Sequence, residues 1–384
     1  MNIFNLRHEL TGSITDIPLP EKIVLSLCGQ RLYAGLDETV MAGQHIARSD
    51  RPGYGDLHSP VYGTIKKIDA DSVTIRTLPG RTLPGKTLRD QEWMAPIEPD
   101  ESDTQRLADD LNTLGIDTFD LHPAQTLIIN GLNPEPGVTA FQRILAERRQ
   151  PLLEGLAYAT QLVQPGRIFV AVPEGSQRTL GPCDPLHIRP VYPNSLPQLV
   201  AKAATGSESM DDVVVLGVDR LLDMGRVRMR GLPATVRAIT VQGMDYRVHI
   251  GTPAKDLLAH AGIAPVPGDK IVFGGPMRGQ AQMSPDAPVQ NDTYAVSLFA
   301  REEFLLFQDN PCCNCGECDR ICPARIPVAL MTRSCEFGKY SMALQYDIDA
   351  CFECGMCAYV CPMQRPLVQY IRLGKSELAQ SVAV

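Results

Sequence analysis

Apolar residues at alternate positions, interrupted by glycine and proline, run through the first part of the chain up to about residue 75. This pattern predicts short β-strands joined by turns. We expect a strand and turn at 39–47 and a hairpin built from 57–68 and 72–75. These elements predict a small β domain over residues 1–95.

Strand-like and helical patterns then alternate. The predicted helices are 101–115 and 139–149, and the apolar strands are 126–130, 167–172, 187–192 and 211–218. Strands separated by helices predict βαβ units and a mainly parallel sheet, which offers a nucleotide crevice at the carboxyl ends of its strands. We therefore expect a Rossmann-like α/β domain over 96–230.

A second β-rich region follows at 231–300, and its pattern predicts a small β-grasp-like domain. Its strands are expected at 236–243 and 246–251, with a helix at 252–262 that has Thr252 as N-cap and Pro253 at its first position. The segment 270–279 closes with a glycine-rich turn. Gly274, Gly275 and Gly279 could approach a phosphate, but no P-loop Lys-Ser/Thr follows them, so a tight turn is the preferred interpretation.

The last region, 301–384, has helical periodicity at 326–349 and 367–380. The overall prediction is an α+β multidomain protein. A tandem five-residue repeat at 77–88, TLPGRTLPGKTL, is interpreted as a solvated loop, because two short copies cannot stack as a solenoid.

Composition excludes some classes of function. The chain has 384 residues, a net charge of −8 and a pI near 5.4, which predicts no nucleic-acid binding. It has no apolar run long enough to cross a bilayer, so we expect no direct membrane insertion. The opening MNIFNLRHEL lacks the pattern of a secretory signal.

The cysteines carry the strongest chemical signal. Eight of the 12 form two copies of the pattern C-x2-C-x2-C-x3-C-P, offset by 39 positions. Three closely spaced thiolates can hold one iron–sulfur cube, whereas the fourth cysteine of this pattern binds the other cluster in two-cluster ferredoxins. We therefore predict two [4Fe-4S] clusters, the first bound by Cys312, Cys315, Cys318 and Cys361, and the second by Cys351, Cys354, Cys357 and Cys322.

Zinc and disulfides are the alternatives. Zinc sites usually separate their cysteine pairs by a longer gap, and so many disulfides are unusual without an export signal. Cys313 breaks the spacing and is predicted not to be a ligand. Cys28, Cys183 and Cys335 are interpreted as buried apolar fillers.

Two further candidate sites are weaker. The loop 131–137, GLNPEPG, lacks the G-x-G-x-x-G pattern, and its prolines remove N–H donors that a phosphate would need. Glu135 in this loop is a candidate partner of a ribose or a flavin, with a solvated side chain as the alternative. His45 and His58 are candidate ligands or catalytic bases, but neither has a carboxylate or second histidine at a useful spacing, so surface or turn residues are the preferred interpretation.

The order of these motifs resembles the C subunit of the Rnf electron-transport complex, an ion-translocating ferredoxin:NAD oxidoreductase related to the A subunit of the Na+-translocating NADH:quinone oxidoreductase. The resemblance covers nearly the whole chain. It rests on GQHIA, LHSPVYGTI, LIINGLNPEPGVTA, VQGMDYRVHIGTP, FGGPMRG and the two cysteine runs. It implies a lipoyl-like barrel-sandwich in the first domain and a soluble-ligand-binding β-grasp (SLBB-like) fold in the third.

The chain departs from that family where nucleotides bind. Family members that use NADH carry a GLGGAGFPT-like segment before the LIING strand, and here the segment reads LGIDTFDLHPAQ. Asn133 and Pro134 stand where the family has Glu-Cys, Gly137 replaces Tyr, and Glu135 is the remaining match. The resemblance thus implies an iron–sulfur relay on a scaffold with a degenerate FMN and NADH site.

The functional prediction is an electron-transfer subunit that is not catalytic alone. The resemblance implies other Rnf-like subunits and a ferredoxin or other redox protein as partners, and a peripheral position on the cytoplasmic face of the cell membrane. An FMN-dependent NADH dehydrogenase with an altered loop is one alternative. An interaction scaffold with purely structural clusters is the other.

Overall fold

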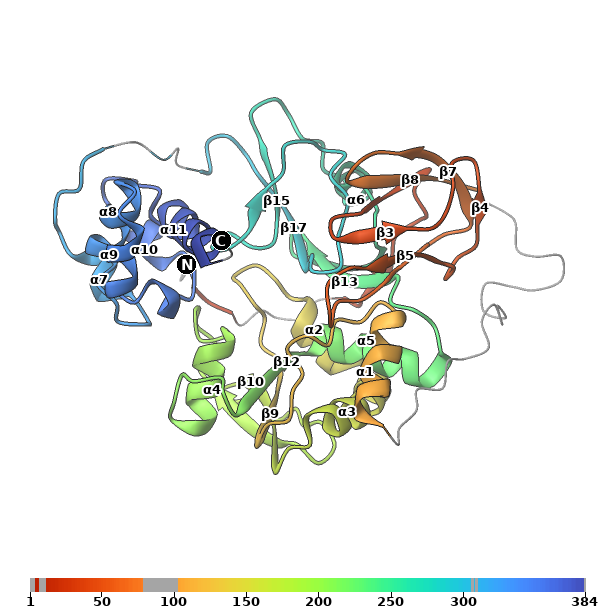
Figure 1. Cartoon of the computed structure of the whole chain (residues 1–384), viewed down its shortest axis with the longest axis horizontal. Helices are drawn as coiled ribbons and strands as arrows, with labels where there is room; N and C mark the ends of the chain where they lie inside the picture. The colour runs from red at the N-terminus through yellow and green to blue at the C-terminus, as the bar shows by residue number, and fades with distance from the viewer. Residues whose placement is uncertain (1–3, 7–11, 79–102, 305–306, 308–309, 383–384) are drawn as a thin grey trace.

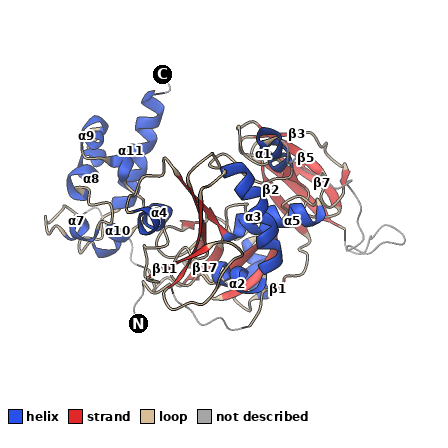
Figure 2. Ribbon diagram, turned by 90° about the horizontal axis from the view of Figure 1, so that it is seen from below, coloured by secondary structure: helices blue, strands red, loops and turns tan. Residues whose placement is uncertain are grey.

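The computed structural model describes residues 4–6, 12–78, 103–304, 307 and 310–382. They form a mixed α/β protein with several sheets, as predicted. Figures 1 and 2 show the helices of the last region gathered at one end and the first strands at the other. Most of the TLPGR repeat lies outside the described residues.

The first strands form two small antiparallel sheets. The predicted hairpin is present, because β7 (Gly63–Ile68) pairs with β8 (Ser72–Thr77). The sheet orders are β2 (Lys22–Ser26), β8, β7, β4 (Thr39–Val40), and β3 (Gln30–Leu32), β5 (His45–Ser49), β6 (Leu57–His58). Alternate side chains such as Ile23, Leu25, Val73 and Ile75 are fully buried between them, which is the period-two pattern of a half-buried strand.

The second region contains the predicted parallel sheet. Its order is β11 (Asp184–Ile188), β10 (Arg167–Pro173), β9 (Thr126–Asn130), β12 (Val213–Gly217), and all neighbours are parallel. Its helices are α1 (Thr104–Thr113), α2 (Ala140–Glu147), α3 (Arg149–Val163), α4 (Pro197–Thr205) and α5 (Val218–Arg230). The strand predicted at 187–192 is wrong beyond Ile188, since Pro190 has no N–H to continue a ladder.

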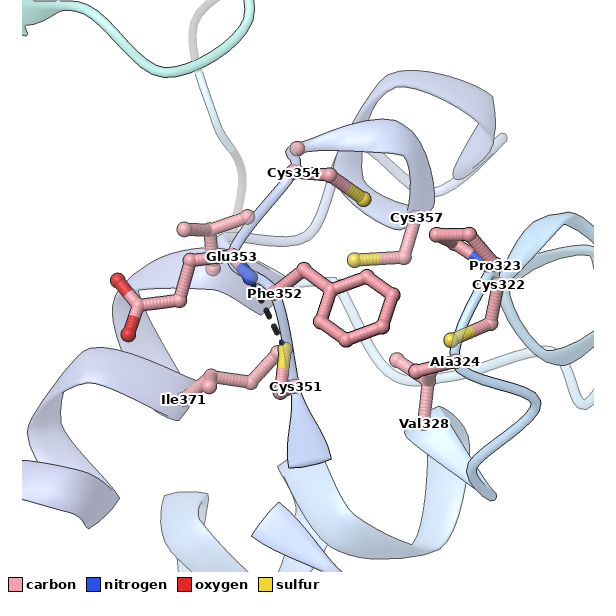
Figure 3. A pocket seen from close by; sticks show the side chains of 12 residues that line it. Cys322, Pro323, Ala324, Val328, Cys351, Phe352, Glu353, Cys354, Cys357 and Ile371 are labelled. Carbon is pink, nitrogen blue, oxygen red and sulfur yellow. Dashed lines mark hydrogen bonds between the residues drawn. The ribbon is translucent and has the colours of Figure 1, made fainter. Parts of the chain in front are cut away.

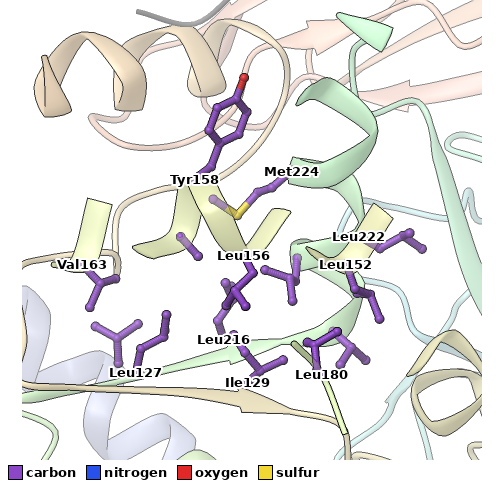
Figure 4. Close-up of a cluster of buried hydrophobic side chains, with 14 of the residues drawn as sticks. Leu127, Ile129, Leu152, Leu156, Tyr158, Val163, Leu180, Leu216, Leu222 and Met224 are labelled. Carbon is purple, nitrogen blue, oxygen red and sulfur yellow. The ribbon is translucent and has the colours of Figure 1, made fainter. Parts of the chain in front are cut away.

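The core of this region lies between the sheet and helices α3 and α5 (Figure 4). Leu127 and Leu216 of the strands meet Leu156 and Met224 of the helices. The two helices touch backbone to backbone at glycines: a Cβ on Gly225 of α5 would collide with the carbonyl oxygen of Pro151.

The third region contributes five strands to a six-stranded sheet, whose edge strand β1 (Thr15–Asp16) comes from the N-terminal part of the chain. The order is β1, β14 (Met244–His249), β13 (Val236–Val241), β17 (Ala295–Phe299), β15 (Lys270–Phe273), β16 (Gln280–Ala281). Helix α6 (Ala254–His260) begins one residue later than predicted. The N-cap prediction for Thr252 was wrong, because Pro253 is the cap and the Thr252 hydroxyl donates to the carbonyl of His249.

The last region is helical. Its elements are α7 (Glu317–Ile321), α8 (Val328–Glu336), α9 (Tyr340–Gln345), the 3-10 turn η1 (Ile348–Ala350), α10 (Met356–Val360) and α11 (Leu367–Val382). The helix expected over 326–349 is therefore broken into three pieces. Gly338, with a φ of 67°, interrupts it after α8, since a left-handed residue cannot continue a helix. None of the helices in the described part of the chain combines the length and apolar composition that a bilayer crossing needs.

The contact at Gly225 gives a direct test of this core. We expect Gly225→Ala to lower the free energy of unfolding by about 1–3 kcal/mol, because the new methyl group has to push α3 and α5 apart. Gly35→Ala is the matched control, since a Cβ there meets nothing closer than the Glu38 carboxylate oxygen at 3.8 Å. Thermal unfolding measures both, and an equal effect of the two substitutions would contradict the packing described.

Candidate iron–sulfur sites

The 39-residue repeat of the sequence is also a repeat of backbone conformation. Helices α7 and α10 each have five residues, pack against each other, and follow a glycine with positive φ, Gly316 at 74° and Gly355 at 80°. Two residues before each glycine stands a left-handed non-glycine residue, Asn314 or Glu353. The backbone N–H of each donates to the sulfur of the first cysteine of its own run, with N···S distances of 3.4 Å.

One set of four cysteines surrounds a common cavity that we call the inner site: Cys322, Cys351, Cys354 and Cys357. Figure 3 shows their sulfur atoms directed toward the same space, which the ring of Phe352 also lines. The surrounding side chains are otherwise mainly apolar, and Cys354 and Cys357 are buried. Cys322 reaches this set from the other half of the repeat.

The other set lines a second cavity that we call the outer site: Cys312, Cys315, Cys318 and Cys361. It is more polar and more open, because Cys315 is exposed and Asn314, Asp319 and Arg365 share the lining. Cys313 also lies at its edge and is exposed. Each of the two cavities is thus lined by four of the eight cysteines, one of which comes from the other half of the repeat.

The chemistry of the two sets suits a metal cluster. None of the eight cysteines forms a disulfide. Burial raises the pKa of the Cys354 thiol to about 11, and burial followed by the charge of Asp319 raises that of Cys318 to about 12. Such thiols stay protonated at neutral pH unless a cationic metal compensates for the thiolate charge. Among the described residues, no three His, Cys, Asp or Glu side chains converge as ligands of a single ion.

The inner site is attached to the body of the protein. The hydroxyl of Tyr192 donates to the carbonyl oxygen of Cys354 over 2.6 Å. A side chain at Gly355 would collide with the carbonyl oxygen of Met277, so the loop after β15 lies directly against the cysteine run. Sequence reasoning missed Tyr192, which it had placed in a strand. No local motif marks this residue.

Glu135 supports the same loop. Its carboxylate is fully buried and accepts backbone N–H groups of Met277 at 2.7 Å and Arg278 at 3.0 Å, together with Gly275 at 3.3 Å. The Tyr294 hydroxyl donates to it as well. The turn that the glycines predicted is thus present, and it holds the chain's own carboxylate rather than leaving Glu135 in solvent.

The prediction of a surface or turn position was wrong for His58, and the expected lack of a histidine or carboxylate neighbour was wrong for His45 as well. Pairing of β5 with β6 places His45 opposite His58, with ring centroids 5.1 Å apart, and the His45 Nε2 lies 3.0 Å from the Asp56 carboxylate. His58 is buried, and this burial, followed by the neighbouring His45, lowers its pKa to about 3. Cross-strand neighbours cannot be identified from sequence spacing alone.

The cysteines outside the two sites differ in their exposure to solvent. Cys183 and Cys335 are buried as predicted, whereas Cys28 is exposed, and the prediction for it was wrong. Cys28 lies in a turn between β2 and β3, where the Arg51 guanidinium lies 3.9 Å from its sulfur.

Curated proteins of one name match most of this sequence. The C subunit of the ion-translocating oxidoreductase complex from Rhodobacter capsulatus is 26% identical over 90% of this chain and 74% of its own length. Its counterpart from Erwinia tasmaniensis is 29% identical over 95% of this chain and 51% of its own length. The chain is similar to these C subunits along nearly its whole length. This confirms the resemblance to the Rnf complex, and it means that the chain spans about half of the Erwinia protein.

Comparisons with family models and with solved structures found less similarity. No family model matches the sequence. A solved NAD+-reducing [NiFe]-hydrogenase in the H2-reduced state is 12% identical, with a TM-score of 0.43 over 62% of this chain and 50% of the hydrogenase chain.

The buried carboxylate of Glu135 yields a testable prediction. We expect Glu135→Gln to lower the free energy of unfolding by about 1–3 kcal/mol, because an amide N–H2 would face backbone donors that now share a carboxylate. The exposed Glu302→Gln is the control for the charge change. The measurement is the thermal unfolding midpoint of both variants, and an unchanged midpoint for Glu135→Gln would show that the carboxylate does not support the loop.

Proposed function

We propose that the chain is an iron–sulfur electron-transfer subunit of an Rnf-like complex and is not catalytic alone. The observation that carries this proposal is the crossed grouping of eight cysteines around two neighbouring cavities. The relatives from Rhodobacter and Erwinia support it, since their name describes an oxidoreductase complex of several subunits.

The proposed ligands are those of the outer site for one [4Fe-4S] cluster and those of the inner site for the other. Each cluster, when bound, supplies a one-electron redox couple. The chain's own residues supply the thiolates, shield the inner site with apolar side chains, and leave an edge of the outer site open at Cys315. The open edge is where a redox partner can approach.

We further propose that the nucleotide site of the wider family is lost here. The N–H groups of the turn after β15 point at the carboxylate of Glu135, and such a nest is where an anionic ligand would otherwise bind. The loop before β9 has no glycine-rich segment. A flavin content near one FMN per chain in purified protein would contradict this part and favour an FMN-dependent NADH dehydrogenase.

The assignment of the remaining parts follows from the same resemblance. We propose a barrel-sandwich domain at 1–95, a Rossmann-like domain at 96–230, a β-grasp domain at 231–300 and a two-cluster ferredoxin domain at 301–384. The proposed partners are other subunits of the complex and a ferredoxin or similar redox protein. The proposed place is the cytoplasmic face of the cell membrane, held by those subunits.

Paired substitutions test the crossed ligand sets. Two clusters predict about eight iron atoms per chain. We expect Cys318→Ala with Cys361→Ala to retain about half of that iron, because both residues belong to the outer site. Cys318→Ala with Cys322→Ala should remove nearly all of it, although these residues are only four positions apart. The measurement is the iron and sulfide content of anaerobically purified protein.

Cys313→Ala is the matched control and should retain the full iron content. The reverse result for the two pairs would show that each run of cysteines holds its own cluster, and little iron in the unsubstituted protein would contradict the proposed function itself.

A further inference from the structure

The two sites differ at one equivalent position. Asn314 and Glu353 are separated by 39 residues (353 − 314), have φ values of 56° and 51°, and donate their N–H groups to equivalent cysteine sulfurs at 3.4 Å. The outer site therefore has a neutral amide side chain beside its first cysteine, and the inner site has a carboxylate there.

Two cations of α11 meet this carboxylate. Lys375 Nζ lies 3.0 Å and Arg372 Nε 3.1 Å from the Glu353 oxygens. They are three residues apart on the helix and so share one face. The carboxylate and the two cations thus form one ion-pair cluster beside the first cysteine of the inner site.

Lys375 also contacts the ligand run itself. Its ammonium donates to the carbonyl oxygen of Cys351 over 2.8 Å, and its side chain is 27% exposed. At the outer site, Arg320 donates to the carbonyl oxygen of Cys315 over 3.1 Å, but its side chain is 67% exposed. Water and salt screen the charge of an exposed group far more than that of a partly buried one.

We propose that Lys375 is a positioning and charge-setting residue of the inner site, which neutralises Glu353 and raises the reduction potential of the cluster bound there. The proposal rests on the iron–sulfur function proposed above. Reduction adds one electron, and so one negative charge, to a cluster. Net charge and solvent exposure are among the factors that set cluster potentials. A cation held beside Cys351 therefore favours the reduced form, and an unpaired Glu353 disfavours it.

The test is a redox titration of the anaerobically purified full chain with both clusters bound, followed by electron paramagnetic resonance. We expect Lys375→Met to lower the midpoint potential of one of the two clusters by about 59 mV, which for a one-electron couple is a factor of about ten in the reduction equilibrium constant. The midpoint potential of the other cluster should stay unchanged. Lys375→Arg should restore the original midpoint, because it keeps the charge. Glu353→Gln should raise the midpoint of the same cluster.

Lys339→Met is the control, because it removes an exposed lysine from the same helical region. Unchanged midpoints in Lys375→Met, or an equal shift in Lys375→Arg or Lys339→Met, would overturn the proposal. If the Lys375→Met protein does not bind both clusters, Glu353→Gln becomes the deciding variant. A midpoint potential that does not rise in Glu353→Gln would then overturn the proposal. A chain that never binds two clusters would instead contradict the proposed function, so the two failures are distinguishable.

Discussion

The exchange of the fourth cysteine between the two halves of the repeat is the constraint on which the proposed sites depend. Cys322 is the C-cap residue of α7 and lies at the inner site, and Cys361 is the C-cap residue of α10 and lies at the outer site. Neither half can complete its set of four thiols alone. Helices α7 and α10 pack against each other, and the proposed cluster binding would couple the folding of this region to the metal.

The two sites share a backbone conformation but differ in the burial and polarity of their surroundings. The inner site is buried among apolar side chains and held against the body through Tyr192, Met277 and the loop that Glu135 supports. The outer site has an exposed cysteine and polar neighbours. A repeated ligand pattern has thus produced one site joined to the body of the protein and one that faces solvent.

The sequence predicted what depends on local spacing. The parallel sheet and the hairpin at β7 and β8 follow from periodicity. The crossed cysteine sets follow from the 39-residue repeat and stay a prediction. The sequence did not predict the features that depend on contacts between distant segments. The burial of Glu135 depends on the turn after β15, and the pairing of His45 with His58 depends on strand register. The contact of Tyr192 with Cys354 depends on a fold that residue spacing does not encode. The difference between Asn314 and Glu353 is visible once the two repeats are aligned, whereas its partners on α11 are not.

The central claim is that two neighbouring clusters are bound by the crossed sets. Electron paramagnetic resonance of the fully reduced, anaerobically purified chain tests it most directly. We expect two [4Fe-4S] signals that broaden each other through spin coupling, since the sites share the packed helices α7 and α10. A single uncoupled signal, or a chain that binds zinc and gives no signal on reduction, would contradict it.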